Sequence, residues 1–294
     1  MIALRFAIYG ELLTLLGLIA YPFHAGASGA FKLSRLPLLI LLSAGLMLST
    51  LVWLATVASM SGTDIMAIDR NILAVVTQDT VAGKAFITRS IALILAIGLA
   101  LMFKPRWPVL AALTAAVATL AWSGHAAVTE GWVGALHRGA DVAHLLAAAM
   151  WLGTLVVLLR QIALLARRDG EGSIDAVLAE LQCFATAGSL IVVTILASGA
   201  INILAIIGPD NLAKLPDTRY GLLFFVKLSL FLVMLCCAGL NRWVLAPRLA
   251  ASTNEGANRA AFILGLSIAI ELLAAVMILG AVAWLGMLDP TQSL

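Results

Sequence analysis

The sequence has 294 residues, of which 63% are hydrophobic and 11% charged, and its mean hydropathy is +1.08. No water-soluble domain needs this much apolar surface, and a net charge of +3 is too small to indicate a nucleic-acid partner. The lipid bilayer is therefore the expected solvent. Because backbone polar groups in lipid must be satisfied within each segment, apolar runs of about 20 residues predict helices and not barrel strands.

We expect an all-α polytopic membrane protein that forms one integral membrane domain over residues 1–294. Its apolar runs predict eight transmembrane helices, at about 2–23, 36–59, 85–103, 108–127, 138–160, 182–207, 221–241 and 261–287. The first run lacks the pattern of a cleaved signal peptide, so it is expected to be the first helix. An even number of crossings places both termini on one side of the membrane.

Two connections are long enough to carry structure of their own. Within residues 61–84, an amphipathic patch at 69–76 predicts a short helix on the membrane surface. Residues 165–181 are charged and are expected to continue the fifth and sixth helices into the cytoplasm.

Charge placement predicts the orientation. Ten Lys and Arg residues lie in or beside the loops that join helices 1–2, 3–4, 5–6 and 7–8, against eight on the opposite side. The positive-inside rule places the side with more cations in the cytoplasm. We therefore expect both termini in the periplasm, at a bacterial inner membrane.

A short motif occurs twice, four predicted helices apart. Thr80-Val-Ala-Gly83 is followed by Arg89, and Thr218-Arg-Tyr-Gly221 is followed by Lys227, each time at the start of a predicted helix. Both copies read T-x-x-G-x5-[K/R]. The recurrence suggests two four-helix halves related by an axis along the membrane normal.

The candidate metal or cofactor site lies around the fourth and fifth predicted helices. His137, Asp141 and His144 occur at i, i+4 and i+7, which places them on one helical face, and His125 ends the preceding helix. Imidazole is the commonest metal ligand, and a carboxylate can orient it from behind. In the alternative interpretation, His137 lies in interfacial water and His144 bonds to a neighbouring helix.

Other residues have the right chemistry for a path through the membrane. Met60 and Met66 flank a polar loop segment and could act as soft ligands. Two carboxyl groups, Glu11 and Glu271, are predicted deep within the bilayer, where a charge must pair or line a path. The candidate partners for these carboxyl groups, in structural ion pairs or along a conduction path, are Arg89 and Lys227.

No motif for enzymatic catalysis stands out. The sequence shows no phosphate-binding loop, nucleophile triad or nucleotide motif, and its three cysteines form no C-x-x-C pair. We therefore expect the protein not to be an enzyme.

Several segments together resemble one family, the CopD/PcoD copper resistance membrane proteins. The resemblance covers predicted helices 3 to 8, whereas helices 1 and 2 match only in hydropathy. The segments that carry it are Ser123-Gly-His125-Ala, His144 to Gly153 with Trp151, Ser198-Gly199, Thr218-x-Tyr220-Gly221 with Lys227, and Asn241-Arg242.

The resemblance implies an eight-helix inner-membrane protein of copper homeostasis that moves copper from the periplasm toward the cytoplasm. A small periplasmic copper-binding protein of the CopC type is the implied partner. Imidazole and carboxylate suit Cu(II), whereas His, Met and Cys suit Cu(I). We expect His125 and His144 to form the entry site, with Asp141 orienting and His137 or Met66 assisting.

Two other functions fit the same histidines. Histidines from two neighbouring helices could bind a b-type haem axially, in an electron-transfer protein. A sensor or assembly factor could also bind copper without conducting it.

Overall fold

The computed structural model describes residues 1–24, 31, 33–102, 106–122, 131–165, 174–252 and 254–288, and these ranges are helical, without a strand. Ten α-helices occur in them: α1 Ile2–His24, α2 Arg35–Ser61, α3 Arg70–Asp79, α4 Val81–Met102, α5 Trp107–Ala118, α6 Gly131–Leu165, α7 Ile174–Ile207, α8 Arg219–Leu240, α9 Ala246–Ala250 and α10 Asn254–Leu285. Shorter 3-10 and π turns connect some of them: η1 Ile65–Ala67, η2 Thr119–Trp122, η4 Pro209–Asp217 and η5 Asn241–Leu245.

Seven helical segments in the described ranges are long and apolar enough to cross a membrane: Ile2–His24, Arg35–Ser61, Val81–Met102, Gly131–Leu165, Ile174–Ile207, Arg219–Ala250 and Gly256–Leu285. The predicted span 108–127 coincides with a shorter apolar helix, Trp107–Trp122, formed by α5 and η2. The rest of that span, residues 123–127, lies outside the described residues. The all-α, multi-pass prediction is confirmed, and the structure identifies seven long spans.

Helices α6 and α7 are longer than the predicted spans 138–160 and 182–207. They contain 35 and 34 residues, so each is about 50 Å long against a hydrocarbon core of about 30 Å. The predicted continuation of these helices into the charged connection is confirmed as far as Leu165 and from Ile174 onward. Residues 166–173 lie outside the described ranges.

The predicted surface helix is α3. Asp69 is its N-cap, and the side-chain Oδ1 accepts hydrogen bonds from the backbone N–H groups of Asn71 (2.7 Å) and Ile72 (3.3 Å). These bonds satisfy donors that the first helical turn leaves open. Helix α3 is attached to α2 because the Trp53 indole N–H donates to Thr77 Oγ1 (3.1 Å).

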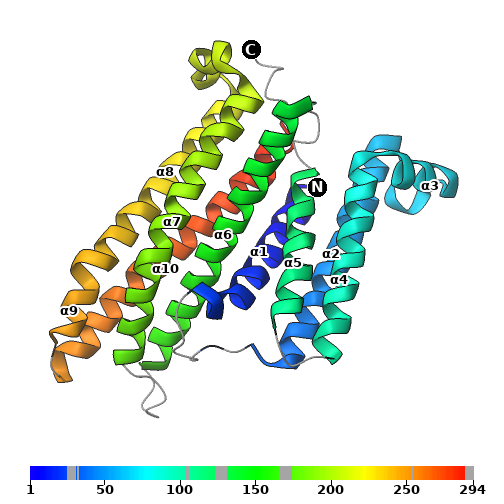
Figure 1. The fold of residues 1–294 in the computed structure, drawn as a ribbon. Coiled ribbons are helices and arrows are strands. Elements are labelled where there is room, and N and C mark those ends of the chain that lie inside the picture. The colour runs from blue at the N-terminus through cyan, green and yellow to red at the C-terminus, as the bar shows by residue number, and fades with distance from the viewer. Residues whose placement is uncertain are drawn as a thin grey trace.

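The helices form one bundle with α1 near its centre. Helix α1 packs against α6, α10, α2 and α5, while α7 and α8 lie on the far side of α6 and α10 (Figure 1). Arg5 Nη1 donates to the backbone oxygen of Gly286 (2.6 Å), which holds the start of α1 beside the end of α10. We call this end of the bundle the terminal end.

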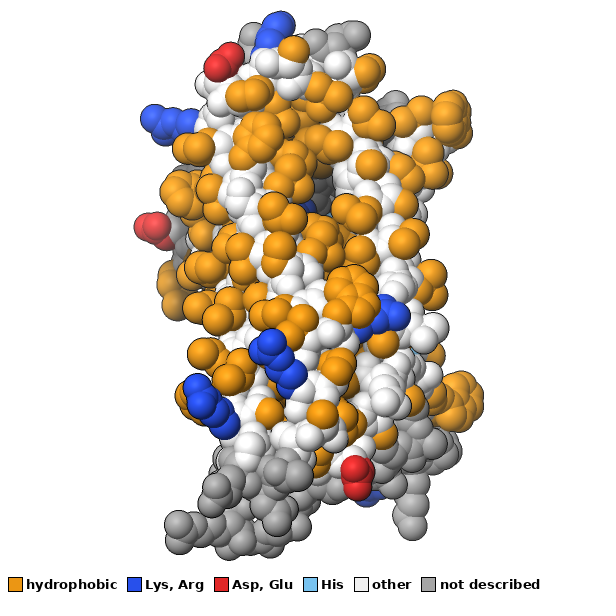
Figure 2. Space-filling model, turned by 90° about the vertical axis from the view of Figure 1, so that its left-hand side faces the viewer, with side chains coloured by type: hydrophobic (Ala, Val, Ile, Leu, Met, Phe, Trp, Pro, Cys, Tyr) orange, Lys and Arg blue, Asp and Glu red, His pale blue; other side chains and the backbone are white. Residues whose placement is uncertain are grey.

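Apolar side chains cover the outside of the bundle. Large hydrophobic residues such as Met47, Leu190 and Ile270 are exposed at the middle of long helices. Figure 2 shows one face on which hydrophobic side chains predominate and charged ones are few. This surface is suited to lipid and not to water.

The two copies of the repeated motif have the same local structure. Thr80 immediately precedes α4, and its Oγ1 accepts a hydrogen bond from the backbone N–H of Gly83 (2.9 Å). Thr218 immediately precedes α8, and its Oγ1 accepts the equivalent bond from the backbone N–H of Gly221 (2.8 Å). A Cβ on either glycine would overlap the backbone of the short helix before it, α3 or η4. Both motifs therefore fold a short surface helix tightly onto the start of a long one.

Helices α1 and α6 cross in direct backbone contact at Gly17 and Gly153. A Cβ on Gly17 would lie 2.8 Å from the Cα of Gly153 and would overlap the oxygen of Ala149. Small residues allow helices to approach this closely in a membrane, where association depends on van der Waals packing.

We expect Gly17→Ala and Gly153→Ala each to destabilise the protein by about 3 kcal/mol, because the added methyl meets backbone that cannot move aside. Thermal unfolding of the purified protein in detergent, followed by size-exclusion chromatography, measures the effect. Gly139→Ala in α6 is the matched control, since a Cβ there meets no atom within 4 Å. Unchanged stability of both crossing variants would contradict the packing described.

Candidate functional site

Two hydrogen bonds connect α6 and α7 near the terminal end. His144 Nδ1 lies 3.0 Å from Ser198 Oγ, and the Asn202 amide donates to Asp141 Oδ1 at 3.3 Å. Asp141 and His144 are one turn apart on α6, and Ser198 and Asn202 are one turn apart on α7. The predicted face of α6 is therefore turned toward polar groups of a neighbouring helix.

The contacts of Ser198 determine which nitrogen of His144 carries the proton. Ser198 Oγ lies 2.5 Å from the backbone oxygen of Thr194, so its one proton is donated there. The Ser198 oxygen then accepts from His144 Nδ1–H, and the carbonyl of Ile195 also interacts with the ring. In a neutral ring the lone pair is then on Nε2, and this is a form of imidazole that binds a metal.

Gly199 leaves room for this imidazole. A Cβ added to Gly199 would lie 3.7 Å from Cε1 and 3.9 Å from Nδ1 of His144, which is ordinary contact distance. The ring thus lies against the backbone of α7, and a larger side chain at residue 199 would displace it.

Two further helices add charged and phenolic groups to the site. Lys227 of α8 interacts electrostatically with both Asp141 and His144. Tyr9 of α1 interacts electrostatically with Asp141 and with Arg89. The site therefore lies among α1, α6, α7 and α8, and its carboxylate has a cation nearby. Tyr9 and Asn202 were not predicted; a lone Asn four residues after Ser198 in an apolar helix was the available signal.

The histidines beyond His144 have different outcomes. His137 is 2% exposed, so the alternative interpretation, which placed it in interfacial water, was wrong. Helix α6 already begins at Gly131, so residue 137 is in its second turn and packs inside the bundle. His125 lies outside the described residues. Within the described ranges, no group of three or more His, Cys, Asp or Glu side chains could hold a metal ion.

The two predicted methionine ligands lie on the surface. Met66 is 99% exposed and Met60 is also exposed. Met66 belongs to η1, which packs against α2, on the opposite side of the bundle from α7 and α8 in Figure 1. The structure does not bring these thioethers to His144.

Glu271 forms a second polar cluster deeper in the bundle. Its side chain is 2% exposed, and its two oxygens accept hydrogen bonds from Trp151 Nε1 (2.6 Å) and Asn241 Nδ2 (3.1 Å). Asn241 is the first residue of the π turn η5, and such turns are frequent at functional sites. Trp151 is itself buried, and its indole N–H anchors this carboxyl group.

The other charged residues predicted within the bilayer have separate surroundings. Glu11 packs against α2, where a Cβ on Gly45 would lie 2.7 Å from Oε2, and its oxygens find no hydrogen-bond partner among the described residues. Arg89 Nε donates to Ser49 Oγ (2.7 Å). Arg89 therefore bonds to Ser49, and Lys227 interacts with Asp141. Neither cation is paired with Glu11 or Glu271 among the described contacts.

Polar contacts continue along α6 toward the opposite end of the bundle. His24 Nε2 lies 3.1 Å from Thr154 Oγ1, and its Nδ1 lies 3.0 Å from the backbone oxygen of Ala20. His144, Trp151 and Thr154 therefore contact polar partners on three different helices in sequence order along α6. His24 lies at the end of this series that is farthest from His144.

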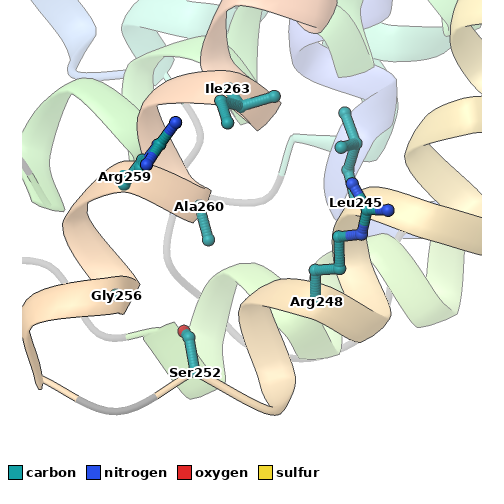
Figure 3. Close-up of a pocket in the computed structure, with 7 residues that line it drawn as sticks. All are labelled: Leu245, Arg248, Ser252, Gly256, Arg259, Ala260 and Ile263. Carbon is teal, nitrogen blue, oxygen red and sulfur yellow. The ribbon is translucent and has the colours of Figure 1, made fainter.

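A larger cavity lies at the opposite end, between α9 and α10. It has a volume of about 200 Å³ and is lined in part by Arg248, Ser252 and Arg259 (Figure 3). None of the predicted site residues borders it. It places two cations at the end of the bundle that the charge distribution assigns to the cytoplasm.

This arrangement defines a multi-pass membrane protein with a half-buried imidazole and carboxylate site. Residues 1–135 match the family described as "Copper resistance protein D-like, N-terminal domain", and residues 178–285 match "Copper resistance protein D". The chain belongs to the copper resistance protein D (CopD) family. The resemblance inferred from the sequence motifs is confirmed.

Two characterised relatives are similar to the chain. "Copper resistance protein D" of Pseudomonas syringae pv. tomato is 36% identical over 307 residues, which covers 98% of this chain and 96% of that protein. "Inner membrane protein YebZ" of Escherichia coli (strain K12) is 34% identical over 145 residues, covering 49% of this chain and 47% of that protein. No solved structure matches the chain.

We expect Asp141→Ala to destabilise the protein by about 3 kcal/mol, because it leaves Lys227 in the bundle without its counter-charge. The double variant Asp141→Leu with Lys227→Met should recover most of that loss, since it leaves no uncompensated charge. Unfolding midpoints of the single and double variants measure the coupling. Strictly additive losses would show that the two residues do not interact.

Proposed function

We propose that this protein moves copper ions across the bacterial inner membrane, from the periplasm toward the cytoplasm. The observation that carries the proposal is the state of His144: Ser198 holds Nδ1, Nε2 has a free lone pair, and Asp141 lies one turn away. A neutral imidazole fixed in this way is ready to bind copper in either oxidation state. Membership of the CopD family supports copper as the cargo, in preference to haem.

The entry site would need ligands from more than one helix. His125 follows η2 in the chain and would supply a second imidazole, with Asp141 orienting the site and His137 one turn away on α6. Met60 and Met66 lie exposed near the terminal end and would receive Cu(I) from a donor. A periplasmic copper-binding protein of the CopC type is the partner we expect to deliver the ion.

Release is as important as capture for a transport protein. Conduction requires sites that bind an ion weakly enough to let it leave. Lys227 opposes a cation bound at His144, which would keep the residence of copper short. Deeper in the membrane, the Glu271 cluster, the Glu11 carboxyl and His24 offer polar groups along the route toward the cytoplasm.

The same proposal includes eight crossings, with α5 and η2 forming the fourth. These two segments contain 12 and four residues, a length of roughly 26 Å, which falls only slightly short of a hydrocarbon core of about 30 Å. The bond between Arg5 and Gly286 supports this count, because two termini on one side require an even number of crossings. The cation distribution favours the periplasm for that side.

Two four-helix halves would underlie this topology. The identical capping of α4 and α8 supports the repeat, as does the division of the two family matches between residues 135 and 178. The path for copper would then lie where the halves meet.

Loss of the imidazole should abolish transport. We expect His144→Ala to eliminate copper uptake by proteoliposomes that contain a copper-sensitive fluorophore. Ser198→Ala should weaken copper binding about 10-fold, because the ring loses the group that fixes its tautomer. Leu136→Ala, an exposed position on the same helix, is the control and should transport normally. Normal uptake by a folded His144→Ala protein would refute the proposed entry site.

Cysteine labelling tests the topology. In a variant with Cys183, Cys236 and Cys237 replaced by alanine, single cysteines are introduced at four positions and exposed to an impermeant maleimide on intact spheroplasts. The substitutions are Thr63→Cys, Lys104→Cys, Ala127→Cys and Ser252→Cys. We expect labelling at 63 and 127 only, because a crossing by Trp107–Trp122 separates 104 from 127. Equal labelling at positions 104 and 127 would show that Trp107–Trp122 does not cross the membrane, so that the protein has seven crossings.

A further inference from the structure

A small cavity lies near the terminal end among α1, α2, α4 and η2. Its volume is about 60 Å³, and its polar lining consists of Arg5, Tyr9, Thr56 and Arg89, with Trp53 as one wall. The cavity thus brings two guanidinium groups together and has no acidic side chain in its lining. This is an unusual composition inside a protein that handles cations.

Arg89 is the most deeply buried of these groups. Its side chain is 3% exposed. Its Nε donates to Ser49, but Nη1 is buried and has no hydrogen-bond partner among the described residues. The residue that acts on it electrostatically is Tyr9, and no described Asp or Glu pairs with it. A buried guanidinium without a counter-charge is costly, and charges inside a membrane are normally paired.

The second copy of the repeated motif shows what Arg89 lacks. Lys227 occupies the same place in its motif, nine residues after the capping threonine, and it interacts with the carboxylate of Asp141. At the first copy, the corresponding cation borders a cavity. The comparison suggests that a ligand provides there the negative charge that a side chain provides at the second copy.

We propose that this cavity binds a small monovalent anion, either a halide or the carboxylate of a small molecule. Arg89 Nη1 would donate to it directly. Arg5 uses Nη1 for Gly286 and keeps further N–H donors. The Thr56 hydroxyl donates to the oxygen of Val52, and the Trp53 N–H donates to Thr77, so these two residues bound the site without supplying donors.

The volume limits the ligand. One water molecule needs a cavity volume of about 10–15 Å³, so this cavity has room for about four to six water-sized units. Chloride, acetate or bicarbonate would fit, whereas a six-carbon sugar acid would not. Tyr9 lines the cavity and also interacts electrostatically with Asp141, so the bound anion would act on a residue of the site proposed for copper. Binding of the anion does not depend on copper transport and can be tested without the metal.

Thermal unfolding of the wild-type protein in detergent tests the site. Sodium gluconate is replaced stepwise by sodium chloride, or in a second series by sodium acetate, at a fixed sodium concentration. We expect a saturable rise in the unfolding midpoint of about 3 °C when the anion exceeds its dissociation constant about 10-fold. A response to both salts indicates a site for any small free anion, whereas a response to acetate alone indicates one for carboxylates.

Two variants locate the effect. Arg89→Gln removes the charge but can still bond to Ser49, and it should abolish the rise. Arg70→Gln removes an exposed cation in α3 at the same end, and it should respond like the wild type. A wild-type midpoint that is the same in chloride, acetate and gluconate overturns the proposal, whether or not Arg89→Gln folds. A rise that persists in Arg89→Gln also overturns it, because the anion is then bound elsewhere.

Discussion

The backbone contact between Gly17 of α1 and Gly153 of α6 is the constraint on which the rest of the bundle depends. It joins α1, the first helix of the chain, to α6 without any side chain between them. Because the two helices run in the same direction, polar residues on α1 meet polar residues on α6 on either side of the crossing. Tyr9 faces Asp141 toward the terminal end, and His24 reaches Thr154 toward the other.

The polar groups inside the bundle are distributed in small, separate clusters. Asp141 and His144 bond to α7, while Glu271 bonds to Trp151 and to the π turn that begins at Asn241. Each cluster joins at least two helices, so the same hydrogen bonds hold the fold together and form the candidate site. Lipid outside the bundle offers no alternative partners, which makes these contacts specific as well as stabilising.

The features set by local pattern were predictable from the sequence. Apolar runs predicted the long helices, and the amphipathic patch predicted α3. The repeated motif marked the beginnings of α4 and α8, which share one capping structure. Contacts between helices could not be predicted, because hydropathy does not say which face meets which neighbour. For that reason Asn202 and Tyr9 were missed, and His137 was placed in water although an earlier helix start buries it. One partner of Glu271, Asn241, belongs to a π turn, which hydropathy does not predict.

The glycine crossing also restricts how the two helices can move. With backbone pressed against backbone, α1 and α6 cannot slide past one another or separate at that level without losing their contact. What remains is rotation about the point where they touch. Rotation about this contact moves the two ends of the helix pair in opposite senses. When α1 and α6 move apart near Tyr9 and Asp141, they move together near His24 and Thr154, so a gap at one end of the pair excludes a gap at the other.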